Sequence, residues 1–249
     1  MADAALAHNW ANPPSRPAHI EKLVSDVDRY SPQSRDILLQ YLENQLENGT
    51  NDILANLAIL KLFQLNPSDF SLDTAVLILI KALTATPFPD FHLCISLLGE
   101  APVRTLSIHD TTQASTGKIT EPIIVRLSTL SELLFQTKFV QFWNLYSSDE
   151  YKDVRSYTSK VAHFEDDIRR VALYSVKGAF RTISESRLSS YLHLEGEALA
   201  RFIENQREEG WSLANGTVAV PPNPDNEVKS TVVREEVSLE NLSKLLAQA

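Results

Sequence analysis

The sequence is poor in cysteine and glycine, and these shortages exclude several classes of protein. Cys94 is the single cysteine, so a disulfide scaffold is excluded and a reducing compartment is favoured. Glycine occurs 7 times and proline 12 times in 249 residues, and the prolines gather between apolar segments, which favours helices. No apolar run approaches the length of a membrane span, and the N-terminus lacks a secretory signal pattern. We therefore expect a cytoplasmic protein without membrane contact; a nuclear location stays open.

Motifs of catalysis and ligand binding are missing as well. None of the six histidines has a His, Cys or Glu at metal-ligand spacing on a helix. The sequence has no glycine-rich phosphate loop and no nucleophile elbow. We interpret Glu165-Asp166-Asp167 as the acidic start of a helix rather than a catalytic carboxylate cluster, because negative charge is favoured there. We predict a protein that is not an enzyme and has no catalytic residue, cofactor or metal site.

The charge balance is acidic, with a formal net charge of −9. A surface that coats nucleic acid is normally basic, so this balance makes other proteins the expected partners. Hydrophobic residues make up 43% of the chain, which is enough for a sizeable core.

The first half reads as a succession of helices. The stretch 51–67 is apolar over most of a helical circumference, so we predict a buried helix around which the other elements are arranged. Asn51 or Asp52 can cap its start, and Asn66-Pro67 ends it. Cys94 lies among leucines and is expected to act as a small core residue. Short amphipathic helices in sequence predict a mainly α protein with a solenoid of helix pairs.

The organisation of the chain follows from these patterns. We interpret residues 1–18 as a flexible leader, in which Trp10 is a stray surface residue rather than a partner anchor. Residues 19–163 form the predicted helical repeat domain, interrupted by a polar loop at 107–121. Residues 164–222 form the next domain, and residues 223–249 form a C-terminal linker and helix.

The pattern of residues 164–222 is that of a winged helix. A helix, a short helix capped by Ser184 and a third helix over 197–209 precede Asn215-Gly216, which sits between two alternating runs. This dipeptide is the strongest short-range hairpin signal and predicts that Leu213 pairs with Val218.

A winged helix raises the possibility of nucleic-acid binding through its third helix. Residues 197–209 carry four glutamates against two arginines, a net charge of −2, whereas a helix facing phosphates should be basic. Arg201, Asn205 and Arg207 are the candidates for an auxiliary RNA contact.

The C-terminal segment carries a leucine stripe made of Leu239, Leu242, Leu245 and Leu246. An amphipathic helix of this kind either folds back onto its own winged helix or joins helices of a partner, and the sequence leaves both readings open.

Several stretches together give the chain a family resemblance. The segment 55–67, ANLAILKLFQLNP, resembles the hallmark of the subunit k family of eukaryotic translation initiation factor 3. Further matches follow in order: Arg29-Tyr30-Ser31-Pro32, Lys81-Ala82-Leu83-Thr84, Asp90-Phe91, Leu93-Cys94, Phe142-Trp143, Phe164-Glu165, Ile168-Arg169 and Gly210-Trp211. The segments 1–17 and 107–121 depart from the shorter family pattern, and Asn51 and Phe63 stand where tyrosines are common.

The resemblance implies a fold and a role. It implies a HEAT-like α-helical repeat domain followed by a winged helix of the PCI type. It also implies a non-catalytic scaffold subunit of the initiation factor, with subunit l as the expected neighbour, that supports assembly on the small ribosomal subunit and mRNA recruitment. There are two alternatives. One is a PCI-type scaffold subunit of a proteasome-lid or signalosome-like assembly, and the other is a winged-helix RNA-binding protein.

Overall fold

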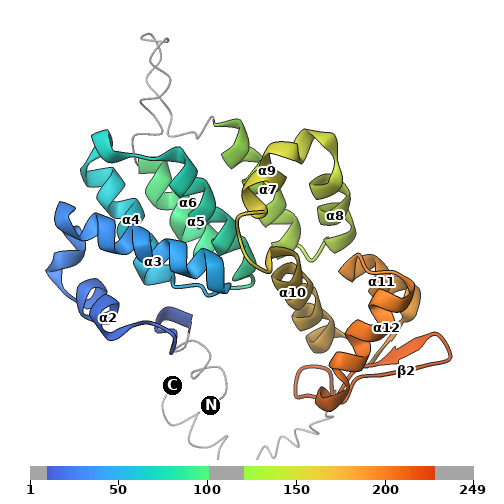
Figure 1. Cartoon of the computed structure of the whole chain (residues 1–249). Coiled ribbons are helices and arrows are strands. Elements are labelled where there is room, and N and C mark those ends of the chain that lie inside the picture. The colour runs from blue at the N-terminus through green and yellow to red at the C-terminus, as the bar shows by residue number, and fades with distance from the viewer. Residues whose placement is uncertain (1–9, 101–120, 228–249) are drawn as a thin grey trace, which may run out of the picture.

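The computed structural model describes residues 10–100 and 121–227, and helices dominate it. The chain forms an arc of helical repeats followed by a winged helix, as Figure 1 shows. The repeat part contains α2 (Ala18–Ser25), α3 (Arg35–Asn48), α4 (Ile53–Leu65), α5 (Leu72–Thr84), α6 (Asp90–Glu100), α7 (Pro122–Phe135), α8 (Phe139–Ser147) and α9 (Lys152–Thr158). Short 3-10 turns lie between them at Val27–Tyr30, Pro32–Ser34, Pro67–Asp69 and Asp149–Tyr151.

Local signals set the helix ends where the sequence predicts them. Gly49 follows α3 with φ of 67°, a conformation that favours glycine. The Asp52 carboxylate caps α4 by accepting a hydrogen bond from the Ala55 N–H at 3.3 Å. Pro122 occupies the first turn of α7, where its missing N–H has no cost. The predicted polar loop at 107–121 lies outside the described residues except for its last position.

At the centre of the repeat part, α4, which packs against α2, α3 and α6, is joined by a second buried helix, α5. Helix α5 packs against α6, α7, α9 and α10, and the chain buries it over nearly its whole length. On α4, by contrast, Leu54 and Leu65 remain 36% and 53% exposed. The expectation that 51–67 has neighbours on most sides is confirmed, and one stripe of α4 remains exposed, because hydrophobic periodicity does not say which stripe of an apolar helix lacks a neighbour.

The segment 10–17 corrects the prediction of a flexible leader. The Trp10 ring stacks on Phe88 at 5.7 Å, and its indole N–H donates to the buried carboxylate of Asp90. Arg16 forms a two-pronged ion pair with Asp52 at 2.6 and 2.7 Å, with 2% and 1% of their side chains exposed. These contacts order the segment, and Trp10 is a packed residue rather than a stray one. Residues 1–9 lie outside the described part.

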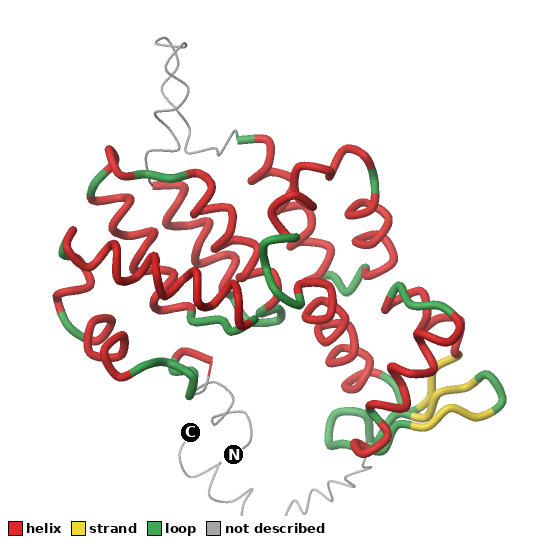
Figure 2. Tube along the Cα trace, viewed as in Figure 1, coloured by secondary structure: helices red, strands yellow, loops and turns green. Residues whose placement is uncertain are grey.

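The winged helix consists of α10 (Phe164–Ala179), β1 (Thr182–Ser184), α11 (Glu185–Leu192), α12 (Gly196–Asn205), the 3-10 turn Arg207–Glu209, β2 (Ser212–Ala214) and β3 (Thr217–Ala219). Its antiparallel sheet has the order β1-β3-β2, drawn in yellow in Figure 2. Asn215 and Gly216 form the turn with φ of 50° and 71°, and Leu213 pairs with Val218 as predicted. The sequence analysis missed β1, and the third helix ends at Asn205 rather than at 209.

A buried lysine lies where the two parts meet. Lys81 on α5 has no exposed surface, and its Nζ has no hydrogen-bond partner among the described residues. Burial lowers the pKa of Lys81, and the charge of Asp167 on α10 acts in the opposite direction. Burial also raises the pKa of Asp167, although that carboxylate pairs directly with Arg170. This contact between α5 and α10 therefore carries an electrostatic cost.

We expect the charge of Asp52 to be essential to the fold. Asp52→Asn keeps the size of the side chain and a capping oxygen but removes the buried carboxylate that pairs with Arg16 through two bonds, so that only the half-exposed Glu21, at 2.7 Å, still pairs with the buried guanidinium. Its free energy of unfolding, measured by urea denaturation, should fall by about 3–5 kcal/mol. The matched control is Asp36→Asn, whose carboxylate is 82% exposed and pairs with Arg35 on the surface; it should change stability by less than about 0.5 kcal/mol. Similar losses in both variants would contradict this account.

Replacing Lys81 by methionine should stabilise the protein by about 1–3 kcal/mol near neutral pH, because methionine has a similar length and no charge to desolvate. The gain should shrink as the pH rises towards the ordinary lysine pKa of 10.5. In that range the unfolded chain binds more protons at Lys81 than the folded chain does, so the wild type gains stability with pH and the variant lacks this term. Urea denaturation at several pH values measures the difference. A methionine variant less stable than the wild type at neutral pH would refute the argument, and Lys152→Met, at an exposed lysine, is the control.

Candidate protein-interaction surface

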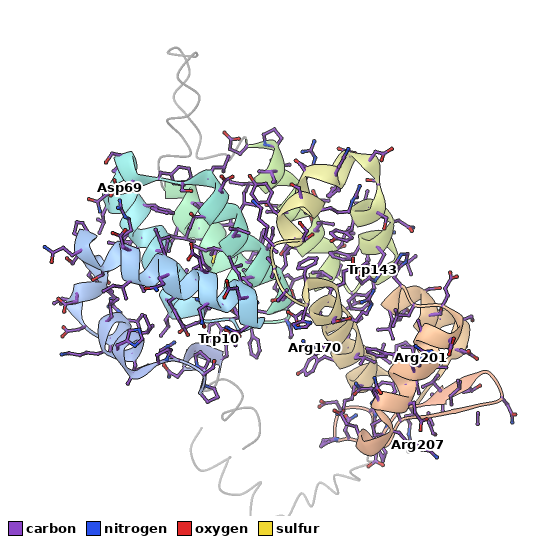
Figure 3. All side chains as sticks on the ribbon, in the orientation of Figure 1. Trp10, Asp69, Trp143, Arg170, Arg201 and Arg207 are labelled. Carbon is purple, nitrogen blue, oxygen red and sulfur yellow. The ribbon has the colours of Figure 1, made fainter. Side chains whose placement is uncertain are left out.

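Hydrogen bonds and ring contacts fix the winged helix to the repeat part. The Trp143 indole N–H on α8 donates to the Tyr191 carbonyl at 2.9 Å, and Trp143 stacks on His193 at 5.4 Å. Arg169 on α10 lies over the Trp143 ring at 5.5 Å and donates from Nε to the Leu192 carbonyl at 3.1 Å. Figure 3 places Trp143 where α8, α10 and α11 meet. The winged helix is thus held in a defined orientation.

The sheet of the winged helix presents an open edge. In the order β1-β3-β2, the strand β2 pairs with β3 on one side and with no other strand in the described part of the chain. Trp211 and Val218 are buried beneath the sheet, whereas Leu213 is 38% exposed. An unpaired strand edge with an exposed apolar side chain can accept a strand or loop from another protein.

The candidates for RNA contact lie along α12, which carries Arg201 and Asn205, and in the 3-10 turn that follows it, which carries Arg207. Arg201 pairs with Glu197 at 2.6 Å, and Arg207 pairs with Glu204 at 2.8 Å (their positions are labelled in Figure 3). Asn205 is exposed on the same helix. The hydrogen bond that Arg207 donates to the Glu204 carboxylate raises the pKa of Arg207. Each guanidinium therefore has its own carboxylate one turn away, and a phosphate would have to displace that carboxylate to bind.

The four leucines of the predicted partner interface, Leu239, Leu242, Leu245 and Leu246, lie outside the described residues. The structure does show where the chain leaves the winged helix. The Asn226 amide donates to the carbonyls of Lys177 and Phe180, both at 3.1 Å, and of Pro221 at 3.0 Å. The sequence analysis overlooked this asparagine, which ties the segment after β3 to the end of α10. The exposed Tyr174 lies one turn earlier on the same helix.

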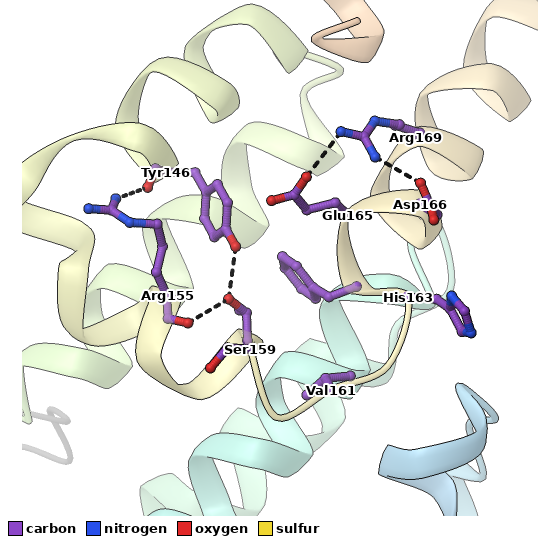
Figure 4. A pocket seen from close by; sticks show the side chains of 10 residues that line it. Tyr146, Arg155, Ser159, Val161, His163, Glu165, Asp166 and Arg169 are labelled. Atoms are coloured by element: carbon purple, nitrogen blue, oxygen red, sulfur yellow. Dashed lines mark hydrogen bonds and ion pairs between the residues drawn. The ribbon is translucent and has the colours of Figure 1, made fainter. Parts of the chain in front are cut away.

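A polar pocket of about 510 Å³ lies between α8, α9 and the start of α10, and Figure 4 shows it from close by. Its charged groups bind one another or the backbone. Arg169 pairs with Glu165 at 3.0 Å and with Asp166 at 2.8 Å. Arg155 donates to the carbonyl of Ser148 at 2.6 Å and to that of Tyr146. The sequence analysis could not find this pocket, because its walls come from three helices that meet only in the fold.

The chemistry available in the pocket is limited by these pairings. The Tyr146 hydroxyl is 2.8 Å from the Thr158 hydroxyl, and burial raises the pKa of Tyr146, so the phenol stays protonated at neutral pH. The His163 side chain points away from Tyr146 and Arg155 in Figure 4, and the Glu165 carboxylate of the same pocket is held by Arg169 at 3.0 Å. The pair therefore lacks the arrangement that activates a nucleophile.

The described residues contain one cysteine, and its surroundings disfavour reactivity. Cys94 is buried, and burial raises the pKa of its thiol, which opposes formation of the reactive thiolate. Within 10–100 and 121–227, no three His, Cys, Asp or Glu side chains are grouped so that they could hold a metal ion. In the same ranges, no helix combines the length and apolar character that crossing a membrane requires.

Comparisons with known proteins agree with this architecture. Residues 69–232 match the model of the CSN8/PSMD8/EIF3K family. Proteins named eukaryotic translation initiation factor 3 subunit K from Mycosarcoma maydis and Botryotinia fuckeliana are 50% and 35% identical to the chain. The alignments cover 100% of the chain and 97% of the first relative, and 95% of both chains for the second. The subunit of that name from Cryptococcus neoformans is 35% identical over 96% of the chain and 94% of its own length. The chain therefore belongs to the CSN8/PSMD8/EIF3K family and, within it, to the subunit K proteins of eukaryotic translation initiation factor 3.

Proposed function

We propose that the protein is a non-catalytic scaffold subunit of eukaryotic translation initiation factor 3 that works in the cytoplasm. In this role it supports assembly of the factor on the small ribosomal subunit and recruitment of mRNA. The observation that carries the proposal is a winged helix with an open strand edge, fixed on a rigid helical arc, in a chain 50% identical to a subunit of that factor. The internally paired charges of the pocket support a role in binding rather than in chemistry.

The partner surface we propose combines the winged helix with the C-terminal leucines. The edge of β2 and the exposed Leu213 supply backbone and apolar contacts. Leu239, Leu242, Leu245 and Leu246 follow from a point fixed by Asn226 beside α10. Subunit l is the neighbour we expect there. A rigid platform favours such docking because less conformational freedom is lost on binding.

The family model spans subunits of three different assemblies, so a proteasome-lid or signalosome-like assembly is the alternative. The relatives at 35% and 50% identity carry the initiation-factor name, which favours the initiation factor. Mass spectrometry of proteins that co-purify with the native chain separates these alternatives. Recovery of lid or signalosome subunits in place of initiation factor subunits would overturn the proposal.

Removing residues 239–249 should leave a folded, helical protein and abolish recovery of the other subunits in a pull-down. The physical reason is that the deletion removes four leucines from the proposed interface but no residue of the described core. Circular dichroism checks the fold, and immunoblotting of the pull-down measures assembly.

Two variants sharpen this test. Replacing only Leu239, Leu242, Leu245 and Leu246 by alanine should have the same effect while keeping the chain length. Val125→Ala, at an exposed apolar residue of α7 outside the proposed interfaces, is the matched control and should assemble normally. Full recovery of the complex with the deleted chain would show that docking occurs elsewhere.

RNA contact through α12 should contribute little. Arg201→Ala together with Arg207→Ala should change RNA affinity less than about twofold at any salt concentration, because both guanidiniums are already paired. Electrophoretic mobility shifts with unstructured RNA measure this. The reverse control, Glu197→Gln with Glu204→Gln, releases both arginines and should strengthen binding. A strong, salt-dependent loss in the alanine variant would instead favour an RNA-binding function.

A further inference from the structure

The outward face of α4 is more apolar than its own fold requires. Leu54, Leu57, Lys61 and Leu65 follow one another along this face at helical spacing. Leu54 and Leu65 are 36% and 53% exposed, whereas Leu57 is partly covered. A single exposed leucine is ordinary, but a stripe of them on one helix marks a surface that lacks its neighbour.

The stripe forms one wall of a groove, which we call the α4 groove. Its volume is about 270 Å³, and its apolar walls come from Tyr30, Leu54, Leu57 and Leu97 on three different elements. Tyr30, at the end of the 3-10 turn after α2, is 43% exposed. The apolar surface of the groove is therefore exposed to solvent at Tyr30 and Leu54.

Two cations, and no carboxylate, line the α4 groove. Arg29 stacks on the Tyr30 ring at 4.9 Å and donates from Nη1 to the Val24 carbonyl at 3.0 Å, while its buried Nε has no acceptor. Lys61 Nζ donates to the Gln64 side chain at 2.6 Å. Neither cation forms an ion pair within the described residues, although the whole chain carries a net charge of −9. The groove is thus a basic, apolar site on an acidic protein.

We propose that the α4 groove binds an acidic amphipathic helix of a neighbouring subunit. Leucines at helical spacing would cover Leu54 and Leu57, and flanking carboxylates would pair with Arg29 and Lys61. The expectation that the partner is found in the initiation factor assembly rests on the proposed function. This surface is separate from the winged helix and gives the subunit a second contact.

Charge also separates this occupant from the chain's own C-terminal segment. Residues 228–249 contain leucines at suitable spacing, but their three glutamates are matched by two lysines and one arginine. Such a segment has no net negative charge with which to attract the two cations of the groove. Docking of the segment in cis is therefore the competing outcome of the tests.

The first test uses the full-length protein and two fluorescent peptides of about five helical turns. Both carry leucines at every third or fourth position; one has glutamates at the flanking positions and the other has lysines. In fluorescence anisotropy at low salt, the glutamate peptide should bind at least about tenfold more tightly. Lys61→Glu should remove this preference, and Lys152→Glu, at an exposed lysine of α9, should preserve it. Equal binding of both peptides, absence of binding, or a preference unchanged in Lys61→Glu would overturn the proposal.

The second test locates the occupant in the native assembly. A photoreactive p-benzoylphenylalanine replaces Tyr30, and mass spectrometry identifies the cross-linked peptide. An acidic, leucine-bearing helical segment of another subunit supports the proposal. A cross-link to residues 228–249, to a basic segment or to RNA, or no cross-link at all, overturns it. Recovery of the other subunits with Lys61→Glu tests the proposed function separately, because the winged helix and the C-terminal residues are unchanged in that variant.

Discussion

The burial of α5 on all its sides is the constraint from which the rest of the structure follows. This helix packs against α6, α7 and α9 of the repeat part and against α10 of the winged helix, so one apolar element serves both halves. Contacts of this kind are non-directional and gain free energy in proportion to the apolar area removed from water. Lys81 is the exception among its buried residues, and its charge faces α10. The orientation of the winged helix is therefore set by a contact whose buried apolar area stabilises the fold and whose buried charge destabilises it.

A second set of contacts supplies the direction that apolar burial alone lacks. Trp143 and Arg169 donate hydrogen bonds to the backbone carbonyls of Tyr191 and Leu192 at the end of α11. Unlike the apolar contact between α5 and α10, these bonds have a defined geometry. At the opposite end of the arc, the buried pair of Arg16 and Asp52 ties the segment 10–17 to α4. Directional bonds at both ends and apolar contacts in the middle give a platform whose docking surfaces are held in fixed relation.

The positions of helices and turns could be predicted from the sequence better than the contacts between these elements. Caps and turns such as Asp52, Gly49 and Asn215-Gly216 act within a few residues, so their positions could be read directly. The strand β1 has only three residues and forms through pairing with β3, which lies far away in the chain. Trp10 and Arg16 are ordered by Asp90 and Asp52, again across long separations. The pairing of Arg201 and Arg207 with glutamates could have been predicted, because those partners lie one helical turn away. The pocket and the α4 groove could not, because each combines residues from three or more elements.

The distribution of charge decides between the kinds of partner. A nucleic-acid surface gains affinity by releasing counterions from phosphates, which requires cations that are free to neutralise them. Arg201 on α12 and Arg207 just after it are each paired with a glutamate of α12, so binding a phosphate there would exchange one anion for another with little gain. In the α4 groove the two cations form no ion pair within the described residues, and they lie beside leucines and a tyrosine. This combination disfavours a polyphosphate chain and favours a side-chain carboxylate on an apolar helix. The distribution of charge therefore favours a protein partner over nucleic acid at both of these surfaces.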